Sequence, residues 1–117
     1  MTGIGTAAAS APVDVLAVGE AMVVLSPDPP VPLDHAVTLT MSTAGAEANV
    51  VTHVARLGLR AAFASRVGND PFGRMITGTL HGAGVNTAIE VVPGWPTGVY
   101  FKDPGDLQSD GTRRTRR

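Results

Sequence analysis

The sequence has no cysteine and few aromatic residues, and both absences narrow the classes of protein to which it can belong. Without cysteine there is no disulfide scaffold, thiolate metal site or cysteine nucleophile, and the composition fits a cytoplasmic protein. Aromatic residues make up 4% of the chain, so the core has to be built from valine, leucine, alanine and methionine. With 44% hydrophobic and 16% charged residues, the chain is expected to be one globular domain or a piece of a larger one.

Long hydrophobic runs are also missing. No stretch approaches the ~20 apolar residues of a membrane-spanning helix, so no membrane partner is expected. Residues 1–12 carry no basic cluster and are predicted to be a disordered leader, not a signal peptide. The net charge of −1 includes four arginines in the last five residues, and without them it is about −5 (−1 minus 4). An acidic body of this kind argues against a nucleic-acid partner.

Strand patterns recur along the chain. Residues 13–18 form a nearly continuous apolar run, typical of a strand buried on both faces of a parallel sheet, and residues 21–25 are candidates for extending that sheet. Apolar and polar residues alternate over 33–41, which predicts a half-exposed strand. Further short apolar segments predict strands at 61–67, 88–92 and 98–102.

Two helices are predicted between these strands. The first covers about 46–57, with an apolar stripe formed by Val50, Val54 and Leu57 and with Gly58 just after its end. The second begins with Asp70 as the cap and proline at the first helical position. Its buried face is expected to contain Phe72, Ile76, Thr79 and Leu80. This alternation of strands and helices predicts an α/β domain with a parallel sheet.

Six short motifs follow one another in the central part of the chain. They are VGEAM at 18–22, AGAEAN at 44–49, ARLG at 55–58, SRVGNDPFG at 65–73, LHGAGV at 80–85 and TGVYF at 97–101. Together they resemble the ribokinase-like, or PfkB-type, carbohydrate kinases, and within that family the 2-keto-3-deoxygluconate kinases. The resemblance implies that residues 13–104 are the N-terminal part of a Rossmann-like parallel-sheet sandwich with a small β lid, roughly at 21–42 and 97–103. Residues 105–117 are predicted to be a disordered, arginine-rich tail.

The resemblance places Gly45, Ala46 and Asn49 in the sugar pocket. Glycine lets backbone approach a substrate closely because it has no Cβ, and the asparagine amide offers both donors and acceptors to vicinal hydroxyls. Considered without the resemblance, Gly45 is explained by a tight turn and Asn49 by its place early in a helix. Residues 22–24 are Met-Val-Val where many members of the family carry a sugar-binding aspartate, which leaves polyol recognition at that point open.

Two further candidates come from the strand predicted at 98–102. Alternation puts Gly98, Tyr100 and Lys102 on one face of that strand. The resemblance places Tyr100 over the substrate, and Lys102, the only lysine of the chain, would then meet the carboxylate of a keto acid. The alternative for Lys102 is a solvated surface charge.

The resemblance also implies an activity: ATP-dependent phosphorylation of 2-keto-3-deoxygluconate or a related sugar, with Mg²⁺, in a cytoplasmic homodimer or higher oligomer assembled through the lid. The family's Gly-Ala-Gly-Asp segment, which supplies the anion hole and the catalytic base, does not occur in the 117 residues. No catalytic residue or metal ligand is therefore assigned, and the ATP and Mg²⁺ sites are expected to be absent. The chain is expected to be a truncated or frame-shifted form without kinase activity of its own.

Other classes of function are weighed against this one. A dinucleotide-binding domain would need G-x-G-x-x-G after the first strand, and Gly19 stands there without the following glycines. The histidines His35, His53 and His81 show no metal-ligand spacing. A non-catalytic sugar-binding or interaction fragment is the alternative that remains open.

Overall fold

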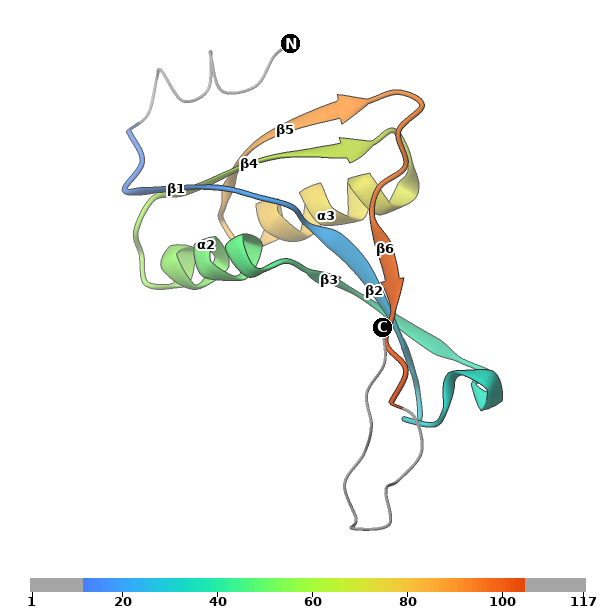
Figure 1. Ribbon diagram of the computed structural model, residues 1–117. Coiled ribbons are helices and arrows are strands. Elements are labelled where there is room, and N and C mark those ends of the chain that lie inside the picture. Colours follow the sequence, from blue (N-terminus) through green and yellow to red (C-terminus); the bar gives the residue numbers. More distant parts are fainter. Residues whose placement is uncertain (1–11, 105–117) are drawn as a thin grey trace.

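The computed structural model describes residues 12–104, which form two three-stranded sheets and two α-helices (Figure 1). Most of the predicted leader (1–12) and the whole predicted tail (105–117) lie outside the described residues. In chain order the elements are β1 (Val15–Val18), β2 (Met22–Pro27), a 3₁₀-helix (Leu33–His35), β3 (Leu39–Ala44), α2 (Ala46–Arg56), β4 (Ala61–Gly68), α3 (Pro71–Gly82), β5 (Asn86–Val92) and β6 (Val99–Phe101).

The first sheet has the order β1-β4-β5 and all its strands run parallel, which confirms the predicted parallel sheet. In register, Ala62 of β4 lies between Leu16 of β1 and Asn86 of β5. Because the strands are parallel, their carboxyl ends share one edge (Figure 1). The second sheet continues from that edge.

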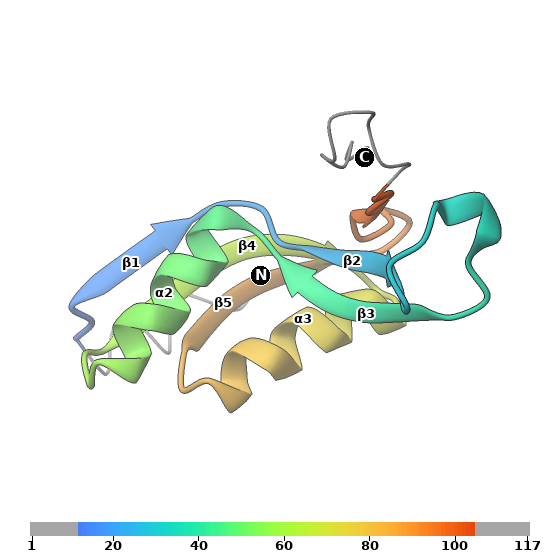
Figure 2. The same cartoon turned by 90° about the horizontal axis from the view of Figure 1, so that it is seen from below.

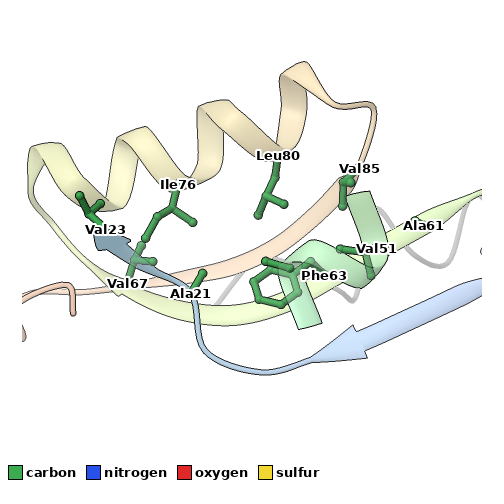
Figure 3. Packing of buried hydrophobic residues seen from close by; sticks show 10 residues of the cluster. Ala21, Val23, Val51, Ala61, Phe63, Val67, Ile76, Leu80 and Val85 are labelled. Carbon is green, nitrogen blue, oxygen red and sulfur yellow. The ribbon is translucent and has the colours of Figure 1, made fainter. Parts of the chain in front are cut away.

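Both helices pack on the same face of the first sheet, α2 against β1 and β4 and α3 chiefly against β5 (Figure 2). The core lies between them, where the fully buried Phe63 of β4 meets Val51 of α2 and Ile76 and Leu80 of α3 (Figure 3). Val23 of β2 also belongs to this cluster, so the second sheet shares the core with the first.

Burial of β1 on both faces, expected from residues 13–18, is wrong for the described part of the chain. Burial alternates along the strand, and Leu16 and Val18 are 50% and 70% exposed. The reason is the placement of the helices, because the face of the sheet opposite α2 and α3 is not covered by any described element. An apolar run shows that a strand is compatible with burial on both faces. The strand is buried on both faces only where other elements cover both sides of the sheet.

The second sheet has the order β3-β2-β6, with β2 antiparallel to β3 and parallel to β6. Residues 21–25 therefore do not extend the first sheet, because β2 pairs with different neighbours. The prediction of a strand over 33–41 is wrong for the first half of that range, where Leu33–His35 forms a 3₁₀-helix. The observed strand, β3, runs from Leu39 to Ala44. The strands of this sheet fall within the ranges predicted for the lid, roughly 21–42 and 97–103, except for residues 43 and 44 at the end of β3. That the sheet acts as a lid stays a prediction.

Helix α2 confirms the predicted element but not its buried face. Val50 and Leu57 are 53% and 78% exposed, whereas Ala48 and Val51 are buried. Val54 is partly buried at the edge of the contact. The small alanine side chain lets the helix axis come close to the sheet, and this close packing decides between two apolar stripes that the periodicity alone cannot distinguish.

Helix α3 begins as predicted, because the Asp70 carboxylate accepts a hydrogen bond from the Gly73 N–H at the start of the helix. Ile76 and Leu80 are buried as expected, but Thr79 is exposed, which corrects the predicted face. Among residues 12–104, neither helix is long and apolar enough to cross a membrane.

Candidate functional site

The candidate site lies where the carboxyl edge of the first sheet meets the second sheet. The link from β1 to β2, the start of α2 and the start of β6 all come to this junction (Figure 1). In open α/β sheets, ligands bind in the crevice outside the carboxyl ends of the strands. The junction is therefore the part of the described chain in which a small-molecule site is expected.

Gly45 is the residue before α2, and its conformation is one that other residues rarely adopt, with φ at 143° and ψ at 129°. A Cβ at this position would lie 2.5 Å from the carbonyl oxygen of Glu20 and 3.2 Å from the Cα of Ala21. The absence of a side chain at Gly45 therefore allows the β1–β2 link of this chain to pack closely against the start of α2. This contact holds the start of α2 against the carboxyl end of β1.

The first turn of α2 presents polar groups that have no partner in the described structure. No side chain caps the helix, and the Asn49 N–H bonds to the Gly45 carbonyl at 3.0 Å. The backbone N–H groups before it, beginning at Ala46, precede the first intrahelical bond and carry the positive end of the helix dipole. The Asn49 side chain is exposed and makes no hydrogen bond with a described residue. These groups are free to bind a hydroxyl or an anion.

Tyr100 lies on β6, in register with Val24 of β2, which in turn pairs with Ser42 of β3. Residues in register share a face, so Tyr100 is on the face of the second sheet that also carries Met22 and Ala44 two residues along. The Tyr100 ring is half-buried, and its hydroxyl bonds to no described residue. Tyr100 and β3 lie on opposite sides of β2, about 10 Å apart across the sheet, and Ser42 is three residues, about 10 Å, from Gly45 along β3.

Lys102 follows β6 directly, and its backbone N–H donates to the Leu25 carbonyl at 2.9 Å. This bond extends the pairing with β2 by one residue, in the register that puts Lys102 on the same face as Tyr100. The side chain is exposed and forms no ion pair within residues 12–104. The ammonium is thus available to a carboxylate ligand. Gly45, Ala46 and Asn49 lie at the junction, whereas Tyr100 and Lys102 lie further along the second sheet, on the other side of β2 from β3. Contact of these five residues with one sugar stays a prediction.

Thr97, the first residue of the motif at 97–101, has no role assigned from the sequence, yet its buried side chain links the segment before β6 to the end of β4 and the start of α3. Its N–H donates to Asp70 Oδ2 at 2.9 Å and its hydroxyl donates to Asp70 Oδ1 at 2.7 Å. The same hydroxyl accepts from the Gly68 N–H at 2.9 Å. The sequence offered two separate hints, the expected helix cap Asp70 and the motif that begins at Thr97 shortly before β6, but nothing in it links them. No spacing rule connects residues 27 positions apart.

These hydrogen bonds lower the pKa of Asp70 below its ordinary value of 3.8. The Thr97 hydroxyl contributes most, followed by the Thr97 and Gly73 N–H groups, with partial burial acting in the opposite direction and Arg74 adding a small attraction. Because the pKa is depressed in the folded state, the stabilisation from Asp70 is present above pH 3.8 and is lost as the pH falls through the lowered pKa.

No metal-binding cluster of side chains occurs in residues 12–104. Between residues 12 and 104 there is no group of three or more histidine or acidic side chains that could hold a metal ion. No catalytic step through ATP or Mg²⁺ is therefore derived from these residues.

Comparison with known proteins gives consistent matches. The family model described as pfkB family carbohydrate kinase matches residues 13–105. The 2-dehydro-3-deoxygluconokinase of Thermoproteus tenax is 38% identical over 98 residues, which cover 83% of this chain and 30% of that protein. The 2-dehydro-3-deoxygalactonokinase of Haloferax volcanii is 34% identical over 92 residues, which cover 79% of this chain and 29% of that protein.

A solved structure agrees with these sequence matches. The crystal structure of 2-dehydro-3-deoxygluconokinase from Thermotoga maritima superposes with a TM-score of 0.76 at 32% sequence identity, covering 87% of this chain and 31% of that one. The chain thus spans about 30% of the length of the curated relatives named above.

Proposed function

This chain belongs to the pfkB family of carbohydrate kinases, and from that premise we propose that it is the sugar-binding part of an ATP-dependent kinase for 2-keto-3-deoxygluconate or a closely related sugar acid. One observation carries the proposal: the first turn of α2, at the junction of the two sheets, and strand β6 of the second sheet both present polar groups without a described partner. A polyhydroxy acid needs such an arrangement, with amide and hydroxyl groups for its hydroxyls and a cation for its carboxylate.

The proposed substrate class rests on the named relatives and on one lysine. The Thermoproteus tenax and Haloferax volcanii proteins are named for two sugar acids that differ in the configuration of a hydroxyl group, and both carry a carboxylate. In this chain the Lys102 ammonium is exposed and unpaired within the described residues, on the same face as the Tyr100 ring. We assign Lys102 to the carboxylate, Tyr100 to the apolar face of the sugar, and Gly45, Ala46 and Asn49 to its hydroxyls.

Replacing Lys102 with alanine is expected to weaken binding of 2-keto-3-deoxygluconate by about tenfold or more, because a charged hydrogen bond of ~1.5–3 kcal/mol is lost. Calorimetric titration of the 117-residue chain measures the dissociation constant. In a complete enzyme the same change should raise KM for the sugar acid by a similar factor.

Arg60→Ala is the matched control, because it also removes one positive charge but lies at the amino edge of the first sheet, beside the start of β4. Ribose, which has no carboxylate, is the matched ligand and should be insensitive to Lys102→Ala. An unchanged dissociation constant for the sugar acid would remove Lys102 from the site. Equal weakening by both arginine and lysine variants would show a long-range charge effect only.

We further propose that this chain does not transfer phosphate by itself. The Gly-Ala-Gly-Asp segment, which supplies the anion hole and the catalytic base in the family, is not present in its 117 residues. The purified chain is expected to show no sugar-dependent ADP release from ATP in a coupled assay. Turnover above the level of a sugar-free blank would contradict this. Homodimer formation through the second sheet and a cytoplasmic location stay predictions.

A further inference from the structure

Three elements that are distant in the sequence are tied together at Asp70 and Thr97. The end of β4 contributes the Gly68 N–H, the start of α3 contributes Asp70 and the Gly73 N–H, and the segment before β6 contributes Thr97. Every polar group of this cluster has a partner: the carboxylate accepts three hydrogen bonds, and the threonine hydroxyl donates one and accepts one. The cluster is therefore a complete network and not an accidental contact.

The backbone leaves no room for adjustment around the network. A Cβ on Gly73 would lie 2.5 Å from the Gly68 carbonyl oxygen and 3.1 Å from Thr97 Oγ1. A Cβ on Gly68 would overlap the Trp95 carbonyl oxygen. The segment before β6 thus packs directly on the end of β4 and the first turn of α3, and its position is set by close contact as well as by hydrogen bonds.

The strand that follows needs such an anchor. Strand β6 has three residues, lies at the edge of the second sheet and pairs only with β2 in the described structure. Short edge strands with few hydrogen bonds open easily, at a small fraction of the cost of global unfolding. Thr97 lies two residues before the strand, and at its other end Asp103 Oδ1 accepts from the Leu33 N–H at 3.1 Å. The strand that carries Tyr100 is held at both ends.

We propose that Asp70 and Thr97 are positioning residues of the sugar site, which hold β6 so that Tyr100 and Lys102 face the bound sugar acid. The assignment of the sugar rests on the function proposed above, whereas the anchoring of β6 does not. Capping alone does not account for the cluster, because a cap uses one carboxylate oxygen for the Gly73 N–H. The second oxygen, Oδ2, is used for the Thr97 N–H.

Asp70→Asn separates the two roles. The amide oxygen can still cap α3, since asparagine is as good a cap as aspartate, but the amide nitrogen then faces the Thr97 N–H, donor against donor. Thr97→Val removes the hydroxyl at nearly constant shape, and Thr97→Ser keeps it. Asp14→Asn is the matched control: Asp14 Oδ2 accepts from the Arg60 N–H at 2.7 Å, so the same chemical change is made at the opposite edge of the first sheet.

Two measurements on the 117-residue chain test the proposal: amide hydrogen exchange by NMR, and calorimetric titration with 2-keto-3-deoxygluconate. The Lys102 and Val23 N–H groups bond to Leu25 and Gly98 across the β2–β6 pair, and they report on β6. The Gly19 N–H bonds to Ala64 between β1 and β4, and it reports on the first sheet. Exchange follows local opening of each pair.

We expect Asp70→Asn and Thr97→Val to speed exchange of the two β6 reporters about tenfold or more, with the Gly19 reporter changed far less, and to weaken sugar binding by a similar factor. Thr97→Ser and Asp14→Asn should behave like the parent chain in both measurements. If Thr97→Val does not fold, the Asp70→Asn and Thr97→Ser pair still decides the outcome.

Three results would overturn the proposal. One is unchanged exchange at the β6 reporters in Asp70→Asn. Another is an equal increase at all three reporters, which would mean that the cluster only adds global stability. The third is faster β6 exchange with unchanged sugar affinity. If the parent chain does not bind the sugar acid at all, the proposed function fails, and the exchange data still show whether the cluster anchors β6.

Discussion

Gly45→Ala is expected to lower the free energy of unfolding by about 2–6 kcal/mol. The residue has φ at 143°, and an added Cβ would lie 2.5 Å from the Glu20 carbonyl oxygen. Forcing a side chain into a rarely populated backbone region costs ~1–3 kcal/mol, and overpacking against rigid backbone costs a similar amount. Equilibrium unfolding in urea, followed by circular dichroism, measures the change. Because the start of α2 has to move, sugar binding should be weakened in the same variant.

Gly58→Ala provides the control for the backbone part of this effect. Gly58 also has a positive φ, 87°, but an added Cβ would have nothing within 4 Å. Its cost should be limited to ~1–2 kcal/mol of conformational strain, and sugar binding should not change. If the two variants are equally unstable, the contact between Gly45 and the β1–β2 link contributes nothing, and the packing described for the start of α2 is wrong.

Phe63→Ala is the second change with a large expected effect. Phe63 is fully buried between the sheet and both helices, and it is among the largest fully buried side chains of the described chain (Figure 3). Removing a buried phenylalanine ring costs ~3–5 kcal/mol, from the lost transfer free energy and the cavity left behind. Since small domains are stable by only ~5–15 kcal/mol in total, a substantial share of the free energy of unfolding should be lost. Urea unfolding at 25 °C measures the loss.

Phe101→Ala removes the same ring from a site that is 44% exposed. With about half of the ring already in water, the expected loss is roughly 1 kcal/mol. A loss at Phe101 as large as the loss at Phe63 would contradict the core described here and would place the main apolar contact in the second sheet.

Local signals predicted the elements of this fold well. The Asp70 cap followed by proline located the start of α3, and Gly58 located the end of α2, because both signals depend on backbone groups within one turn. The longer apolar segments gave β4 and β5 close to their observed bounds. Predictions failed where a segment had no strong local preference, as at Leu33–His35, which alternates like a strand but forms a 3₁₀-helix.

The candidate site could be predicted only in part. Motif resemblance selected Gly45, Asn49 and Tyr100; the structure places the first two at the start of α2 and Tyr100 on β6 of the second sheet, and their contact with one sugar stays a prediction. In the structure Gly45 also has a structural role, because its lack of a Cβ allows close contact with the Glu20 carbonyl oxygen. This role does not depend on a bound substrate. The role of Thr97 was missed because its partner is far away in the sequence and no periodicity links them.

By itself the sequence determined the class of fold, the order of its strands and helices and the family, because these follow from periodicity, caps and short motifs that act over a few residues. Only the tertiary structure decided which strands pair, which face of α2 is buried and which faces remain open. Val50 and Val51 are neighbours of the same type, yet one is exposed and the other fully buried. The difference arises from what packs against each side chain, and packing partners come from distant parts of the chain.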